Sequence, residues 1–291
     1  MRTILIATDF SPAARNATEY GIAFARAFHA KIILTGAYQQ MPIPISDSPI
    51  IVTAEDLRRS VQEQLDTEAL TFGMGTNVPI ETVCSEGPAV SVIPDLAKKM
   101  KADLVILGMK DGRKGMRKFF GSTVTSLARK GKLSLLIIPE EVKYTDPLSI
   151  AFADDLRTDA DIHILDTLRF ITQRFHSNLR VVRVIGQQEE RPVDGSNLPA
   201  RLKKMLQTLD PVFDYPVNED ITYGLKEFVA SRRIDMLVMI PHRHSLLKRW
   251  FGETHTKSMI FEVTVPLLVL PDVRQKPMKI YLSDSRNSAN Y

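Results

Sequence analysis

Short apolar runs alternate with amphipathic stretches along the first half of the chain. Residues 3–8 (TILIAT) and 31–38 (KIILTGAY) are apolar runs of strand length. Between them, apolar side chains recur at helical spacing to about residue 29. Ser11 can cap this helix and Pro12 suits its first turn. The pattern predicts a strand, a helix and a second strand in direct succession.

The alternation continues to residue 139. Thr53 followed by two acidic residues marks the start of a second helix, and residues 89–100 and a segment from about Gly121 predict two more. Three further apolar runs predict strands at 78–87, 103–108 and 134–139. Parallel strands need long crossovers, so this order predicts a parallel sheet covered by helices on both faces.

The second half repeats this plan. Residues 232–241 (RRIDMLVMIP) match 100–109, residues 265–271 match 133–139, and residues 174–182 match 27–35. The repeat also aligns Asp154 with Asp9 at the end of a first strand. We therefore expect an α/β protein of two tandem Rossmann-like domains, each an open five-stranded parallel sheet.

Domain limits follow from the repeat and from composition. The first domain is expected at 1–141 and the second at 146–273, with EEVKYTD (140–146) as the linker. Residues 274–291 are polar and predict a loose or docking tail.

Composition narrows the class of protein. The chain has 291 residues, 44% hydrophobic and 25% charged, which is typical of globular domains. No apolar run approaches the roughly 20 residues that span a bilayer, and the first residues turn polar too early for a signal peptide. We expect a cytoplasmic protein without membrane contact. Cys84 is the one cysteine, which excludes an internal disulfide and thiolate zinc sites.

Basic charge is concentrated in one segment. The net charge is only +4, yet residues 110–132 hold eight Lys or Arg, one acid and four glycines. The segment favours an anionic ligand. Aromatic residues suited to base stacking are missing beyond Phe119 and Phe120, which argues against nucleic acid.

Candidate site residues lie where strands end. Asp9 and Gly108 follow apolar runs, and parallel sheets bind ligands at such carboxyl ends. Gly121 and Ser122 open a helix whose free amides can receive a phosphate. Neither a Walker loop nor GxGxxG is present. From the residues alone, a phosphate loop and a solvated basic turn both stay open.

Four segments together carry a family resemblance. ILIATDFS, DLVILG, GMKDGRKGMRKFFGST and SLLIIP resemble a universal stress protein domain, and the chain resembles a tandem member over about residues 1–273. The resemblance implies a fold like that of the adenine nucleotide alpha hydrolases. Nucleotide-binding members carry Gly, two residues, Gly, nine residues, then Gly with Ser or Thr. The resemblance therefore implies ATP as the ligand.

The family motif can be carried over by position. Gly108 matches the first glycine, Gly121 the third, and Ser122 the following hydroxyl. The resemblance places Asp9 near the adenosine and the backbone of Ala37 near the adenine. Basic residues of the loop are expected near the phosphates. The expected nucleotide site comprises Asp9, Ala37, Gly108, Lys110, Asp111, Gly112, Arg113, Gly121, Ser122 and Thr123.

One position departs from the motif. Asp111 stands where the second glycine is expected, and Gly112 comes one residue late. The Asp111 carboxylate would repel a phosphate unless Mg²⁺ or lysines screened it. Alternatively, the loop shifts by one residue so that Gly112 takes this role.

The second copy has lost the motif. Ile240 matches Gly108, Arg243 matches Asp111, and Glu253 matches Ser122. A carboxylate at a helix start interacts favourably with the free amides, and Glu253 would occupy the place of the phosphate. We expect the second domain to be a structural partner.

Three functions stay open at this stage. The first is an ATP-binding stress protein that acts as a sensor or adaptor for an unknown protein partner. The second is a scaffold without nucleotide, which associates through an intrachain pseudo-dimer and a further homodimer. The family resemblance implies pairing through the last strand. The third is an enzyme with at most slow ATP hydrolysis, for which no catalytic residue or metal ligand can be assigned.

Overall fold

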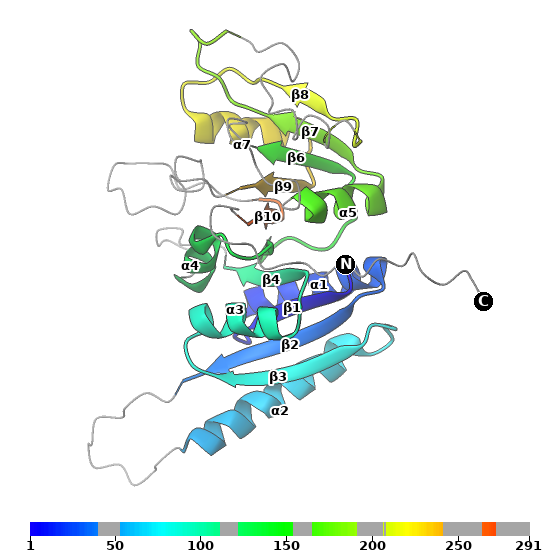
Figure 1. Ribbon diagram of the computed structural model, residues 1–291, viewed down its shortest axis with the longest axis vertical. Helices are drawn as coiled ribbons and strands as arrows, with labels where there is room; N and C mark the ends of the chain where they lie inside the picture. The colour runs from blue at the N-terminus through cyan, green and yellow to red at the C-terminus, as the bar shows by residue number, and fades with distance from the viewer. Residues whose placement is uncertain are drawn as a thin grey trace, which may run out of the picture.

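Ten strands form one continuous sheet that runs the length of the molecule. The computed structural model describes residues 1–39, 53–110, 122–153, 165–190, 206, 208–240 and 264–271. The strand order is β3-β2-β1-β4-β5-β10-β9-β6-β7-β8. The strands are stacked along the long axis, with β3 near one end and β8 near the other (Figure 1).

The first half has the predicted alternation of strands and helices. Its β1 and β2 have the predicted bounds, and the limits of the other elements lie within a few residues of those expected. The elements are β1 (Thr3–Thr8), α1 (Pro12–Phe28), β2 (Lys31–Tyr38), α2 (Ala54–Gly73), β3 (Ile80–Glu86), α3 (Ala89–Lys99), β4 (Leu104–Met109), α4 (Ser122–Lys130) and β5 (Leu135–Pro139).

The second half repeats the order of the strands. Its elements are β6 (Ser149–Ala153), α5 (Asp166–Phe175), β7 (Asn178–Val182), β8 (Val212–Asp214), α7 (Ile221–Ser231), β9 (Met236–Met239) and β10 (Leu267–Val269). The register supports the predicted repeat, because Val105 pairs with Leu135 as Leu237 pairs with Leu267. The sheet order of this half is the mirror of the first.

Helix starts follow the capping signals in the sequence. The Ser11 hydroxyl accepts a hydrogen bond from the Ala14 amide and begins α1. Thr53 begins α2 in a capping box with Asp56, whose carboxylate accepts from the Thr53 amide. At the end of α1, His29 takes the left-handed conformation that closes many helices.

The two halves are joined by one antiparallel strand pair. Leu136 of β5 lies opposite Leu268 of β10, and the neighbouring residues continue the ladder. All other strand pairs in the sheet are parallel. The pairing through the last strand that the family resemblance implied therefore occurs within this chain and merges the two expected sheets into one.

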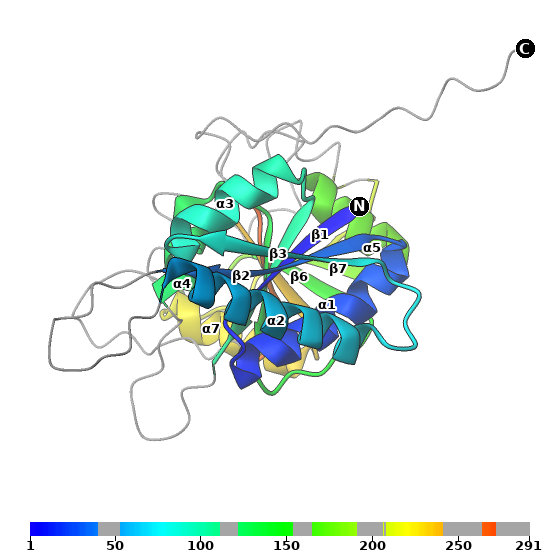
Figure 2. The ribbon, with the colours of Figure 1, turned by 90° about the horizontal axis from the view of Figure 1, so that it is seen from below.

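Helices cover both faces of the sheet. One core contains side chains of α1, α2 and α5, and the other contains side chains of α3, α4 and α7. Each core includes residues of both halves, such as Phe24 with Phe152 in the first and Leu107 with Leu237 in the second. The strands fan about the long axis in the end view (Figure 2). None of the helices in the described ranges is long and apolar enough to span a bilayer.

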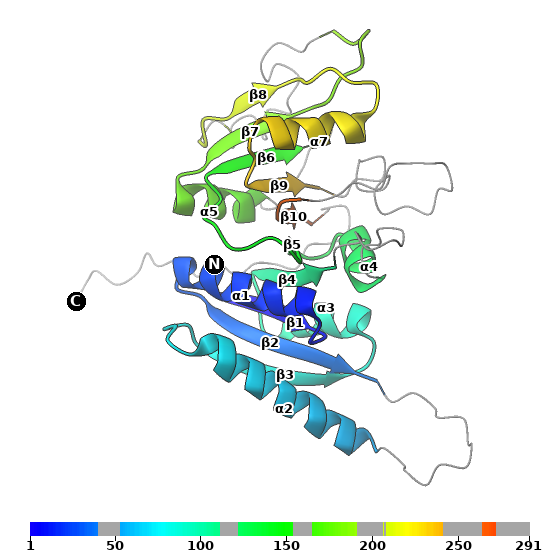
Figure 3. The same cartoon turned by 180° about the vertical axis from the view of Figure 1, so that it is seen from behind.

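Helix α1 connects the first half to the second. It crosses β1 and β4, as seen from behind in Figure 3. Phe28 packs edge-on against Phe175 of α5, with ring centroids 5.6 Å apart. In the second turn of α1, the Asn16 amide donates hydrogen bonds to the carbonyls of Pro139 and Val142 at 3.0 and 2.9 Å. The helix thus holds both the connecting segment and α5.

Two tyrosines that pack against each other, Tyr20 of α1 and Tyr144 of the connecting segment, make the stability of the fold depend on pH in the alkaline range. Burial raises the pKa of Tyr20, and Asp235 and Asp146 add to the effect. Burial also raises the pKa of Tyr144, whose hydroxyl donates a 2.7 Å hydrogen bond to Asp146. Tyr144 packs edge-on against Tyr20. A pKa raised by folding stabilises the protein below the unfolded value of about 10, and this contribution is lost as pH rises further.

We therefore expect the melting temperature to fall as pH increases above about 10, as the unfolded tyrosines ionise. Tyr144→Phe should reduce the steepness of this fall, because it removes one of the two hydroxyls. Thermal melts between pH 8 and 11 measure the effect. An unchanged pH slope in the variant would contradict a role for Tyr144.

Candidate functional site

The fold brings three expected site residues to one edge of the sheet. β1 lies between β2 and β4 and is parallel to both. Asp9 follows β1, while Ala37 and Gly108 lie near the carboxyl ends of β2 and β4. The chain order reverses between β1 and β4, which is where open α/β sheets bind ligands. The three predicted residues therefore lie at the ends of adjacent strands, beside the switch point of the first half.

Other expected residues lie at the two ends of the connection from β4 to α4. Lys110 is exposed just beyond β4, and Ser122 is the exposed first residue of α4. Thr123 is half-buried beside it. The remaining expected residues, Asp111, Gly112, Arg113 and Gly121, lie outside the described residues.

Gly108 has a packing role that the sequence did not reveal. A Cβ at this position would lie 2.3 Å from the backbone oxygen of Ala13 and 2.7 Å from the amide nitrogen of Ala14. The first turn of α1 therefore packs directly on the backbone of β4. We expected this glycine to let backbone approach a ligand, but the contact in the structure is between helix and strand.

The turn after β1 is held in an uncommon conformation. Phe10 has φ of 62°, in the left-handed region that bulky residues seldom adopt. Such a conformation costs about 1–3 kcal/mol and needs support from its surroundings. The Phe10 amide donates a 2.9 Å hydrogen bond to the Thr8 hydroxyl, and the Ser11 amide donates at 3.1 Å to Asp9. These bonds fix the backbone on both sides of Phe10.

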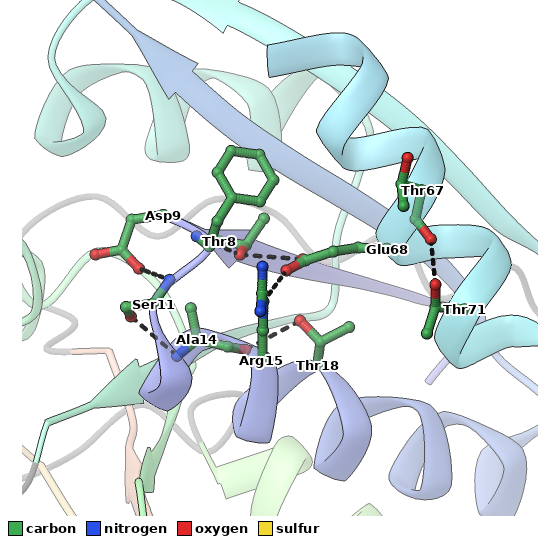
Figure 4. Close-up of polar contacts among 10 residues, drawn as sticks. Thr8, Asp9, Ser11, Ala14, Arg15, Thr18, Thr67, Glu68 and Thr71 are labelled. Carbon is green, nitrogen blue, oxygen red and sulfur yellow. Dashed lines mark hydrogen bonds and ion pairs between the residues drawn. The ribbon is translucent and has the colours of Figure 1, made fainter. Parts of the chain in front are cut away.

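A buried carboxylate from α2 reaches this turn. Glu68 accepts hydrogen bonds from the Thr8 hydroxyl at 3.3 Å and from Arg15 Nε at 3.1 Å, as Figure 4 shows. Its side chain is only 7% exposed, whereas that of Arg15 is 57% exposed. Sequence reasoning missed Glu68 because it lies mid-helix and 60 residues from Thr8. Its position on the apolar side of α2, three residues after Leu65, was the available signal.

A second polar group lies near Tyr38, the last residue of β2. Arg58 of α2 makes two hydrogen bonds to Glu55, at 2.9 and 2.7 Å. Hydrogen bonding to Arg58 lowers the pKa of Glu55. At the end of β2, burial and then the charge of Glu86 raise the pKa of Tyr38. The only sequence signal was the spacing of Glu55 and Arg58 on one helix face.

The two halves differ at equivalent helix starts. In the first half Pro88 precedes α3, and its side chain provides no cap. In the second half the Asp220 carboxylate caps α7, accepting from the amides of Thr222 and Tyr223. Glu219 also accepts a hydrogen bond from the Gln187 amide at 2.9 Å. In the second half, carboxylates of the chain itself therefore accept hydrogen bonds from these backbone amides. An anion could otherwise bind such amides.

The loss of the glycine is visible in the second half. Ile240, which matches Gly108, is buried with 2% of its surface exposed. A buried isoleucine side chain therefore occupies the position that is glycine in the first half. The other divergent positions, Asp154, Arg243 and Glu253, lie outside the described residues.

The parallel sheet and the position of the candidate site define an α/β protein of the Rossmann-like class. Residues 1–139 match the model of the Universal stress protein family, so the first half of the chain is a domain of that family. No match was found among curated proteins.

Solved structures share the fold over both halves. A universal stress protein from Archaeoglobus fulgidus DSM 4304 has a TM-score of 0.67 and 14% identity, covering 92% of this chain and 97% of its own. A functionally unknown protein from Pseudomonas aeruginosa PAO1 has a TM-score of 0.53 and 13% identity, covering 94% and 93%. These likenesses show the fold alone.

A universal stress protein solved in complex with cAMP is less similar. It has a TM-score of 0.36 and 21% identity, and covers 48% of this chain and 98% of its own. This likeness carries no inference about a ligand here.

We expect Gly108→Ala to destabilise the protein by about 1–3 kcal/mol, because the added Cβ meets helix backbone that cannot rotate away. Chemical denaturation measures the loss. Gly186→Ala is the control, since its Cβ would meet nothing closer than 3.5 Å. Equal stability of Gly108→Ala and the unaltered protein would contradict the packing role.

Proposed function

We propose that the protein is a cytoplasmic stress-response protein that binds ATP in its first half and signals the bound state to a protein partner. One observation supports the proposal: Asp9, Ala37 and Gly108 lie at the ends of adjacent strands beside the switch point, in a domain of the universal stress protein family. The basic segment after β4 supplies charge suited to a triphosphate, with or without Mg²⁺. No catalytic step is part of the proposal.

The proposed organisation is tandem and asymmetric. The first domain comprises residues 1–141 and the second 146–273, followed by the tail at 274–291. The first binds nucleotide and the second is a structural partner. The sequence supports this asymmetry, because Ile240 stands where the first half has Gly108 and Glu253 stands where it has Ser122. The Glu253 carboxylate would repel a phosphate at that position.

A scaffold without nucleotide is the second candidate. The β5–β10 pair favours it, since this contact already joins the two halves. The resemblance implies that the last strand of each domain pairs with another domain, and here β5 and β10 pair with each other. A homodimer of this protein would accordingly use another surface.

Calorimetric titration with ATP and Mg²⁺ tests the proposed function. We expect about one site per chain, because only the first half has glycine and a hydroxyl at the matched motif positions, Gly108 and Ser122. Two sites would refute the account of the second half. Absence of heat at two temperatures, at every reachable concentration, would favour the scaffold.

Exchanging the residues that distinguish the two copies tests the asymmetry. Ser122→Glu should abolish ATP binding, because a carboxylate would compete with the phosphate for the amides at the start of α4. Glu253→Ser removes the corresponding carboxylate, and a gain of second-site binding would support its blocking role. Circular dichroism checks that both variants fold. Unchanged affinity of Ser122→Glu would contradict the site assignment.

A further inference from the structure

The buried carboxylate of Glu68 has no role in the family motif, yet it lies beside the residues proposed to bind nucleotide. It extends from α2 toward the end of β1, and Asp9 lies on the opposite side of the same turn (Figure 4). Glu68 is 6% exposed, so it is not available to contact a ligand from solution. Any contribution to binding must act through its neighbours.

Glu68 uses both of its oxygens in this contact. Oε2 accepts from the Thr8 hydroxyl, and Oε1 accepts from Arg15 Nε. A buried carboxylate is costly without such partners, so burial favours the arrangement in which both bonds are made. Thr8 and Arg15 belong to β1 and α1, and Glu68 thereby ties α2 to both elements.

The Thr8 hydroxyl transmits this constraint to the turn. Because its proton is donated to Glu68, its lone pair faces the Phe10 amide, which donates to it at 2.9 Å. That bond supports the left-handed conformation of Phe10. The Phe10 ring lies over β2, where a Cβ on Gly36 would be 3.5 Å from the end of the ring. Asp9, between Thr8 and Phe10, is held by this geometry.

We propose that Glu68, Thr8 and Arg15 form a positioning triad that fixes the turn after β1 and so sets the direction of the Asp9 carboxylate toward nucleotide. The proposal rests on the proposed function, since Asp9 is the residue through which the triad acts. Thr8 and Glu68 are positioning residues and do not touch the ligand.

The direct test is a titration with ATP and Mg²⁺ of two variants at one position. Thr8→Val keeps the size of the side chain but removes the hydroxyl, and should weaken ATP binding about tenfold. Thr8→Ser keeps the hydroxyl and should bind as the unaltered protein does. Equal affinity of Thr8→Val and Thr8→Ser, measured below their melting temperatures, would overturn the proposal.

A double-mutant cycle separates positioning from stability. If Thr8 acts through Asp9, the double variant Thr8→Val with Asp9→Ala should bind no more weakly than Asp9→Ala alone. Full additivity of the two losses would mean that the hydroxyl acts independently of Asp9, and would refute the triad. Loss of melting temperature without loss of affinity would refute it equally.

Glu68→Ala tests the helix α2 side of the triad, with Glu63→Ala as its matched control. Glu63 lies on α2 but is exposed. We expect about tenfold weaker ATP binding for Glu68→Ala and no change for Glu63→Ala. The same loss in both variants would show a general effect of α2 rather than positioning by Glu68.

A readout without nucleotide distinguishes failure of the triad from failure of ATP binding. Exchange of the Phe10 and Ser11 amide hydrogens should be faster in Thr8→Val and Glu68→Ala, and unchanged in Thr8→Ser and Glu63→Ala. If the unaltered protein binds no ATP but exchange changes as expected, the triad still positions the turn and only the proposed ligand is wrong. Unchanged exchange in Thr8→Val and Glu68→Ala would refute the triad whatever the protein binds.

Discussion

The antiparallel pairing of β5 with β10 is the constraint on which the rest of the structure depends. Each strand is the last of its half, and each would be an exposed apolar edge without the other. Leu136, Leu268 and their neighbours are fully buried. Unpaired edges of this kind invite association with other chains. Pairing within the chain removes the hazard and makes a single core on each face of the sheet.

Helix α1 links the candidate site to the second half of the chain, because it contacts both. Its first turn packs on Gly108 and begins beside the turn that holds Asp9, and its last turns contact Phe175 of the second half. Asn16 lies between these ends and binds the connecting segment. A nucleotide that changed the position of the first turn would therefore act on an element in contact with both halves. Differential affinity for two arrangements would be required for such a change to become a signal.

The two halves differ in how the starts of the equivalent helices α3 and α7 are capped. In the first half, the side chain before α3 does not cap the helix. In the second, Asp220 and Glu219 accept backbone hydrogen bonds within the chain. Intrachain carboxylates stabilise helix starts without a ligand. The second half can therefore serve stability and pairing after loss of the motif.

The sequence by itself determined the order of the elements, the repeat and the residues at strand ends. Apolar runs, helical spacing and the caps at Ser11 and Thr53 are local signals, so they can be recognised without distant contacts. The family resemblance likewise selected Asp9, Ala37 and Gly108 for the candidate site. The resemblance also implied pairing through the last strands, which the β5–β10 ladder makes within one chain. Only the tertiary structure decided that this pairing merges the two sheets into one, that Gly108 packs against α1, and that Glu68 supports Thr8. These depend on contacts between residues far apart in the chain, and a linear pattern of hydrophobicity does not encode which distant surfaces meet.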